Sequence, residues 1–171
     1  GKTQTLCQTD LQSQTALEII KKAASVCNYS YEIKETSFGP YLSKINEEEA
    51  TGMSGWLYLV NNTAAMVGAN DYYLKEGDEV IWYYGDWGWQ SLRLSIDKEQ
   101  IDKGQNVEIL VEYFDNSNWL PLAGAEIKIK DKSYFTETNG KLILTLAEGS
   151  YQLRAEKNGF IRSNSVYLLV G

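Results

Sequence analysis

The apolar residues of this chain follow two different spacings, and each spacing predicts a kind of element. After Gln14 they recur at helical intervals, so that one face carries Leu17, Ile20, Ala24 and Cys27. Thr15 with Glu18 three residues later is typical of a capping box, and Asn28 tolerates the left-handed geometry of a helix end. We therefore predict one helix that starts at Thr15 and ends near Asn28.

Elsewhere the spacing is that of strands, with β-branched and aromatic residues alternating between two faces. In the first half of the chain the predicted strands are Lys2–Leu11, Tyr29–Ile33, Tyr41–Ile45, Trp56–Val60 and Glu79–Tyr84. One helix packed on a mixed sheet of four or five short strands is an α+β arrangement. From Trp56 to Val60 both faces are apolar, so one of them requires cover from another domain, a partner or a flat ligand.

The aromatic segment from Asp86 to Gln90 interrupts this pattern and marks a boundary between two domains, residues 1–88 and residues 89–171. Beyond it the apolar positions alternate in short runs, separated by turn signals such as Asn139-Gly140 and Glu148-Gly149. No helical spacing occurs there. The second half is therefore predicted to be an antiparallel, immunoglobulin-like β-sandwich.

Charge narrows the possible partners. The net charge is −7, and residues 1–90 contain 6 basic and 12 acidic side chains against 10 and 11 in residues 91–171. An acidic first half argues against nucleic acid, whose phosphates need clusters of Lys and Arg, and against anionic membrane surfaces. No apolar run approaches the roughly 20 residues of a membrane-spanning helix, so direct membrane insertion is not expected.

Catalytic chemistry finds no support in the sequence. The chain contains no histidine, which excludes Ser-His-Asp and Cys-His arrangements and removes the commonest metal ligand. It has neither a glycine-rich phosphate loop nor a Cys-x-x-Cys pair, and nothing marks a particular pair of carboxylates. We predict a protein that is not an enzyme and holds no metal. The acidic run Glu47–Glu49 is interpreted as a solvated loop rather than a cation site.

Two further pairs of residues leave alternatives open. Cys7 and Cys27 form a disulfide that ties the first strand to the helix end, or they are reduced thiols. Reduced thiols are the favoured interpretation, because Cys7 is out of phase with Leu6 in the predicted strand. Trp87 and Trp89 point the same way in an extended segment. They form a wedge between the two domains, which is favoured, or a platform for a sugar ring or planar ligand.

A fixed order of short motifs gives the first half a likeness to a known family. The motifs are GPYLSKI from Gly39, GWLYLVN from Gly55, GANDYYL from Gly68 and GDEVIW from Gly77. In this order they resemble the transcobalamin-like C-terminal domain family, a module of the soluble-ligand-binding type. The resemblance implies a β-grasp fold with one helix for residues 1–88.

The family also suggests how a ligand is held. In the vitamin B12 carriers this module closes over the corrinoid, and the contacts come largely from the hairpin that corresponds to Gly55–Asn62 and from the loop after it. Carried over, that implies cobalamin or another planar small molecule, bound by Trp56, Tyr58, Val60, Asn61, Met66 and Tyr41. The large helical domain that forms the other half of the carriers' pocket is missing from this sequence, so a lone half-pocket would bind weakly.

The second half resembles carboxypeptidase-regulatory-like and bacterial immunoglobulin-like modules, through Pro121–Ala125, Thr138–Lys141 and Glu148–Tyr151. Modules of these kinds are common spacers on exported proteins. The resemblances therefore imply an extracellular or cell-surface bacterial protein with a non-enzymatic, ligand-binding function. The alternative is a structural or adhesive surface protein whose first domain docks another domain or a protein partner.

Overall fold

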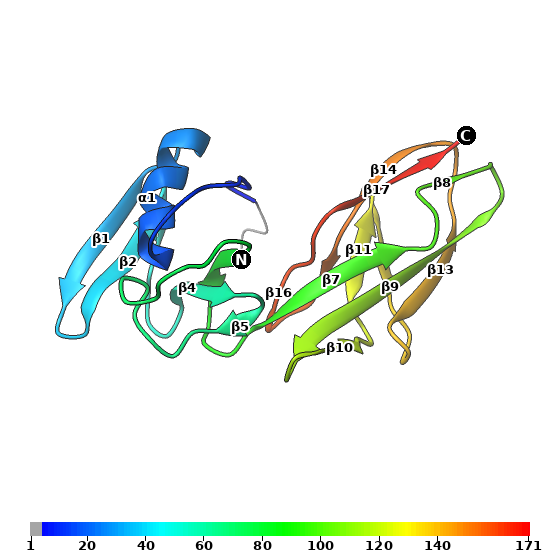
Figure 1. Ribbon diagram of the computed structural model, residues 1–171. Coiled ribbons are helices and arrows are strands. Elements are labelled where there is room, and N and C mark those ends of the chain that lie inside the picture. The colour runs from blue at the N-terminus through cyan, green and yellow to red at the C-terminus, as the bar shows by residue number, and fades with distance from the viewer. Residues whose placement is uncertain (1–4) are drawn as a thin grey trace. The chain divides into compact units, whose positions relative to one another are not determined.

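The computed structural model describes residues 5–171 of a chain that divides into two compact units, residues 1–88 and residues 89–171 (Figure 1). Each unit has a hydrophobic core of its own. The structure is mostly β, with 50% of residues in strands and 7% in helix. Within the described range, no helix is long and apolar enough to cross a membrane.

Helix α1 (Ala16–Cys27) forms where the sequence predicts it. The Thr15 hydroxyl accepts a hydrogen bond from the Glu18 amide (3.2 Å), and the Glu18 carboxylate accepts one from the Gln14 amide (2.8 Å). These bonds satisfy amides at the helix start that have no partner within the helix. At the other end Asn28 is left-handed, with φ of 54°. The buried face consists of Ala16, Leu17, Ile20, Ala23 and Ala24.

The described strands of the first unit form two antiparallel sheets. One sheet contains β1 (Tyr31–Thr36), β2 (Gly39–Ile45) and β3 (Glu48–Glu49), and the other contains β4 (Gly55–Val60), β5 (Thr63–Ala64) and β6 (Val80–Gly85). The helix and both sheets share one core. Its buried members include Leu17 and Ile20 of α1, Leu42 and Ile45 of β2, and Trp56 of β4.

This arrangement contradicts the predicted α+β β-grasp fold. That fold requires one mixed sheet under the helix, whereas these strands pair only antiparallel and stay in two small sheets. The difference begins before the helix. Within the predicted strand Lys2–Leu11, residues 5–11 form no strand, and residues 2–4 lie outside the described part of the chain. The alternating threonines there imitate a strand pattern but give the segment no apolar face to bury.

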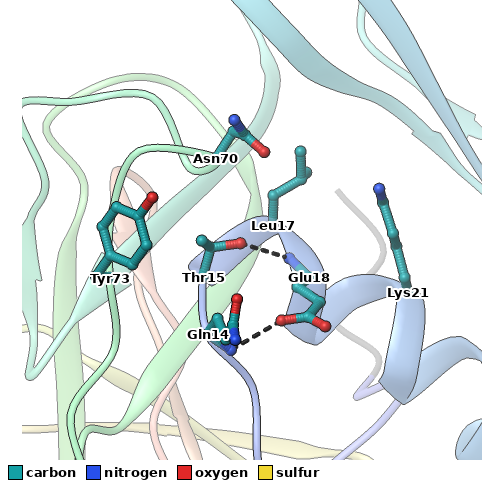
Figure 2. Close-up of a pocket in the computed structure, with 7 residues that line it drawn as sticks. All are labelled: Gln14, Thr15, Leu17, Glu18, Lys21, Asn70 and Tyr73. Atoms are coloured by element: carbon teal, nitrogen blue, oxygen red, sulfur yellow. Dashed lines mark hydrogen bonds between the residues drawn. The ribbon is translucent and has the colours of Figure 1, made fainter.

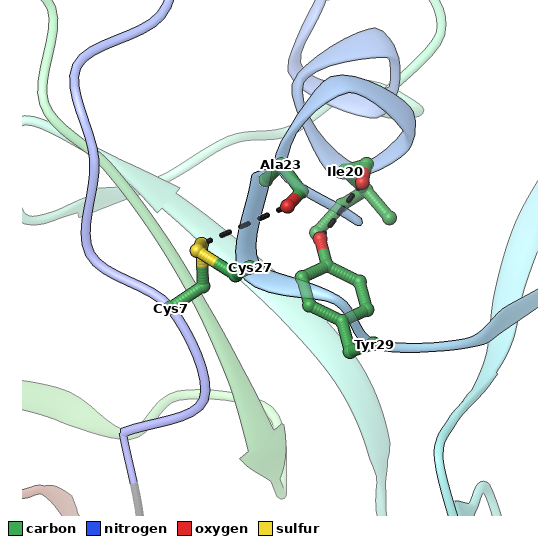
Figure 3. Close-up of a disulfide and its surroundings, with 5 residues drawn as sticks. All are labelled: Cys7, Ile20, Ala23, Cys27 and Tyr29. Atoms are coloured by element: carbon green, nitrogen blue, oxygen red, sulfur yellow. Dashed lines mark hydrogen bonds between the residues drawn. A yellow bond between two sulfur atoms is a disulfide. The ribbon is translucent and has the colours of Figure 1, made fainter. Parts of the chain in front are cut away.

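A disulfide joins this irregular segment to the end of the helix (Figure 3). Cys7 and Cys27 are bonded, with their Cα atoms 5.6 Å apart, so the favoured interpretation of two reduced thiols is wrong. That interpretation relied on the phase of Cys7 within a strand, and a segment without regular structure has no such phase. The Cys7 sulfur lies 3.9 Å from the carbonyl oxygen of Ala23. Because a disulfide sulfur carries no hydrogen, this is a packing contact.

The second unit is a β-structure compatible with an immunoglobulin-like sandwich. Its strands are β7 (Gln90–Ile96), β8 (Gln100–Ile101), β9 (Asn106–Asp115), β10 (Asn118–Pro121), β11 (Glu126–Ile129), β12 (Lys132–Phe135), β13 (Lys141–Thr145), β14 (Gly149–Leu153), β15 (Ala155–Glu156), β16 (Phe160–Ile161) and β17 (Val166–Val170). They form three sheets, with orders β10-β9-β7-β16, β12-β11-β15 and β14-β17-β8, and β13 also pairs with β9. Most pairs are antiparallel, as predicted, but β16 pairs with β7, and β17 with β8, in parallel.

Strand β9 contributes three fully buried side chains to the core of the second unit. Val107, Ile109 and Val111 point inward and are fully buried, which confirms the alternation predicted for this run. On one edge β9 pairs with β7, and on the other with β13 and then β10. Where β13 gives way to β10, the Val111 amide donates to the Gly140 carbonyl (2.9 Å) and its carbonyl accepts from the Leu122 amide (2.9 Å). The backbone of β9 therefore stays hydrogen-bonded across the change of partner.

Side chains complete the hydrogen bonding where the ladders end. The side-chain amide of Asn164 accepts from the Leu94 amide (2.9 Å) and donates to the Leu94 carbonyl (3.1 Å). It thus makes the two bonds that a neighbouring strand residue would make beside β7. The buried Ser163 hydroxyl accepts from the Ala155 amide (2.8 Å) and donates to the Asn164 carbonyl (2.7 Å).

Candidate functional site

The predicted ligand-binding aromatic residues lie in a packed cluster in the first unit. Trp56 and Tyr58 of β4 stand opposite Tyr84 and Trp82 of β6 in the strand register. The Trp56 and Tyr84 rings meet edge to face with centroids 5.7 Å apart, and the Tyr58 and Trp82 rings stack at 5.2 Å. Such pairs contribute about 0.5–1.5 kcal/mol each beyond the burial of their area. This face of the sheet therefore belongs to the core that includes the helix.

The polar atoms of these rings are already hydrogen-bonded within the unit. The indole of Trp56 donates to the Glu48 carbonyl (2.9 Å) and that of Trp82 to the Ala16 carbonyl (3.1 Å). The Tyr58 hydroxyl donates to the Val67 carbonyl (2.7 Å). Burial raises the pKa of Tyr58 to about 12, so its hydroxyl keeps its proton at neutral pH. These groups hold strands, helix and loops together, and they are not aimed at an open pocket.

Two other predicted contact residues also lie in the body of the unit. Val60 is buried at the end of β4. Tyr41 of β2 is half-buried, and its hydroxyl occupies the place that a side chain on Gly55 would fill. Glycine at position 55 therefore permits the close approach of Tyr41 to β4.

Asn61 and Met66 lie beyond β4, in the turn and the loop. Asn61 is left-handed, with φ of 51°, donates to the Asp78 carboxylate (2.8 Å) and accepts from the Glu79 amide (3.0 Å). Asp78 also accepts from the Lys75 amide, and these hydrogen bonds lower the pKa of its carboxyl. Asn61 thus shapes its turn. Met66 is 86% exposed. Among the six predicted residues, only Met66 presents a large apolar side chain to solvent.

The tryptophans at the boundary belong to different units. Trp87 precedes the division and is 61% exposed, while Trp89 begins the second unit and is half-buried. Their predicted roles, as a wedge or as a ligand platform, stay predictions.

A shallow hollow of about 310 Å³ lies at the start of the helix (Figure 2). Its lining is Gln14, Thr15, Leu17, Glu18, Lys21, Asn70 and Tyr73. The hollow exists because the segment before α1 forms a bridge with Tyr73, in which Leu74 donates to the Gln14 carbonyl (2.9 Å). The sequence around Thr15 predicts the capping box but not this hollow, because Asn70 and Tyr73 are distant from the helix in sequence.

The electrostatics of the hollow are set by Glu18. Hydrogen bonds from the Gln14 amide and the Ser13 hydroxyl lower the pKa of its carboxyl, with a further contribution from Lys22. Its negative charge therefore already occupies the positive end of the helix. With a mostly polar lining and this carboxylate in place, the hollow does not offer the apolar enclosure that a planar ligand needs.

The acidic run Glu47–Glu49 is more ordered than a solvated loop. Glu48 and Glu49 form β3, and the Glu49 carboxylate lies 3.0 Å from the Lys34 ammonium. The hydrogen bond and charge of Lys34 lower the pKa of Glu49. Among residues 5–171, no three cysteine or acidic side chains are grouped so that they could hold a metal ion.

Comparison with known proteins finds a likeness to one family model, within the first unit. Residues 13–86 match the model of a family described as a domain of unknown function, DUF4430. This match does not identify the unit as a transcobalamin-like module. No curated protein matches the chain.

Proposed function

We propose that this chain is a non-enzymatic structural segment of an exported protein, and that its first unit docks another domain or protein. The observation that carries the proposal is the use of Trp56 and Tyr58 in the unit's own core. A small-ligand site would require such rings to line a cavity. The exposed large apolar side chains of this unit lie mainly in its turns and loops: Phe38, Met53, Met66, Val67, Tyr73 and Trp87.

The disulfide supports the exported location. Cys7–Cys27 joins two elements of a small unit, and disulfides persist in oxidising compartments outside the cytosol. The β-rich second unit supports a spacer role of the kind that its resemblance to immunoglobulin-like modules implies.

Docking is tested at Met66, the most exposed apolar side chain among the predicted contact residues. A photo-crosslinking amino acid replaces Met66 in the full-length protein on its producing cells, and a second variant carries it at Ile143, which is exposed in the second unit. We expect a discrete protein adduct or an intramolecular cross-link from position 66 and none from position 143. Adducts of equal yield from both positions, or none from position 66, contradict docking through the first unit.

A second candidate function is corrinoid binding, and one observation favours it. The hydrogen bond from Tyr58 to Val67 holds the loop that carries Met66 against β4, where the transcobalamin-like resemblance expects ligand contacts. In this hypothesis Asn61 and Met66 contact the corrinoid, and Trp56 supports them from beneath.

Calorimetric titration of the oxidised chain with cobalamin and cobinamide separates the two functions. The docking proposal predicts no saturable heat. Saturable one-to-one heat would favour corrinoid binding over docking if Met66→Ser reduces it and Met53→Ser, an exposed change elsewhere, leaves it unchanged. The Met53 side chain is a matched control, because it is also exposed and lies before β4 rather than after it.

A further inference from the structure

One face of the second unit lacks the charges found on its other strands. Strands β14, β17 and β8 lie side by side in one sheet (Figure 1). Their outward side chains are all uncharged: Ser150, Gln152, Tyr167, Leu169 and Gln100. We call these five residues the neutral face. By contrast, the outward side of β7, β9 and β13 carries the ion pairs Arg93–Glu112 and Lys141–Glu108, each at 2.7 Å.

The neutral face presents an exposed aromatic ring whose hydroxyl is held in place. Tyr167 is 68% exposed and Leu169 is 45% exposed, on the central strand of the three. The Gln152 side-chain nitrogen lies 3.2 Å from both the Tyr167 hydroxyl and the Ser165 hydroxyl and donates to each. Both amide hydrogens are therefore used, and the Gln152 carbonyl oxygen remains as an acceptor at the edge of the ring.

We infer that the neutral face binds a neutral, extended polysaccharide. A sugar ring has an apolar C–H face and an edge of hydroxyls. The Tyr167 ring and the Leu169 side chain offer apolar area to the first, while Gln152, Ser150 and Gln100 offer hydrogen-bond partners to the second. The absence of charge on the face matches a ligand without charge, because no side chain there would lose an ionic partner or hydration on binding.

The size of the face selects this occupant over a protein. Two five-residue strands, β14 and β17, and the two-residue strand β8 lie about 4.8 Å apart with about 3.3 Å per residue, and together they present on the order of 200 Å². A stable protein interface buries about 800 Å² on each partner. A short run of sugar rings laid along the strands needs no more area than the neutral face provides. This inference concerns the second unit and is independent of the function proposed for the first.

The test is calorimetric titration of the full chain with two neutral β-linked oligosaccharides, cellohexaose and its N-acetylglucosamine counterpart, and with an oligogalacturonate as the charged control. We expect saturable binding of at least one neutral oligosaccharide and no binding of the charged one. Tyr167→Ala should weaken binding about tenfold, since loss of an aromatic contact costs up to about one factor of ten. Tyr167→Phe should weaken it less, because the ring remains.

Ile143→Ala is the matched control, because Ile143 is similarly exposed but lies on the ion-paired side of the unit. It should leave binding unchanged. Absence of saturable binding by both neutral oligosaccharides overturns the inference, as does equal binding by the Tyr167→Ala variant. Self-association that Tyr167→Ala abolishes, without oligosaccharide binding, would assign the face to a second copy of the chain and would also overturn it.

Discussion

Removing the disulfide should destabilise the first unit and leave the second unchanged. Cys7 lies in a segment without helix or strand, so the bond to Cys27 is the main covalent constraint on that segment within the described residues. A Cys7→Ser, Cys27→Ser double variant removes the bond without leaving an unpaired thiol. The noncovalent contacts between segment and helix include the hydrogen bond from Lys22 to the Gln12 carbonyl (2.6 Å), which the variant retains.

The size of the effect follows from the length of chain that the bond closes. The two cysteines are 20 residues apart. In the chain-entropy treatment, closing a loop of this length removes about 11 cal/mol/K from the unfolded chain, which corresponds to about 3 kcal/mol at room temperature. A domain with a stability of about 5–15 kcal/mol loses a substantial fraction of it by this change.

Urea denaturation of the full chain, followed by amide hydrogen exchange, provides the assay. Exchange separates the units, so slowly exchanging amides of β9 report on the second core and those of α1 and β4 on the first. We expect the unfolding free energy of the first unit to fall by about 3 kcal/mol, with the exchange of β9 amides unchanged. A fall below about 1 kcal/mol, well under the chain-entropy value, would refute the reasoning. An equal fall in both units would refute the independence of their cores.

Four further predictions test the packing and the charges. Trp56→Ala should lower the unfolding free energy of the first unit by about 3–5 kcal/mol, as truncation of other buried aromatic residues does, and Trp56→Phe should lower it less. Denaturant titration measures both changes. An unchanged unfolding free energy in Trp56→Ala would contradict the placement of Trp56 in the core. Asn164→Asp leaves the Leu94 carbonyl without its hydrogen-bond donor, and it should lower the unfolding free energy of the second unit by about 1–3 kcal/mol. Asn158→Asp adds the same charge at an exposed position, and it should change this free energy little. The pKa values of Glu18 and Asp78 are lowered in the folded state from 4.5 and 3.8. The stability that these carboxylates contribute is therefore present at neutral pH and is lost as pH falls through their folded pKa values. Thermal unfolding measured against pH should show a smaller loss of stability in acid for Glu18→Gln than for the unchanged protein. Burial raises the pKa of Tyr29 and Tyr83 to about 12, so the first unit should lose stability as pH rises from 10 to about 12. The tyrosinate absorbance that Tyr29→Phe and Tyr83→Phe remove should appear only as the unit unfolds.

Local signals were sufficient to predict the helix. Thr15, Glu18 and Asn28 act within one turn of the positions they define, so their effect does not depend on the rest of the fold. The alternation through Val107, Ile109 and Val111 was equally informative, because an inward face of β-branched residues has one way to be buried in a sandwich.

Contacts between residues that are distant in sequence could not be predicted from the sequence. Nothing near Trp56 and Tyr58 says which face of β4 packs toward the core that contains the helix, since both faces are apolar. Cys7 is disulfide-bonded because residues 5–11 bring it to the end of the helix. This irregular segment has no periodic pattern of apolar residues from which its position could be predicted. The pairing of the Asn164 side chain with Leu94 also joins residues 70 positions apart. Each of these contacts is made by the tertiary fold rather than by local propensity.

The parallel pairs of the second unit determine how it responds to tension. Strand β8 lies near the beginning of the unit and runs parallel to β17 at its end, as β7 does with β16. A pulling force on the two ends of this unit acts in opposite directions along strands that point the same way. The hydrogen bonds of each pair are then sheared together instead of being opened one after another, as they would be between antiparallel strands pulled at one end. In force spectroscopy the second unit should therefore resist extension, and a low, gradual unfolding force would contradict this.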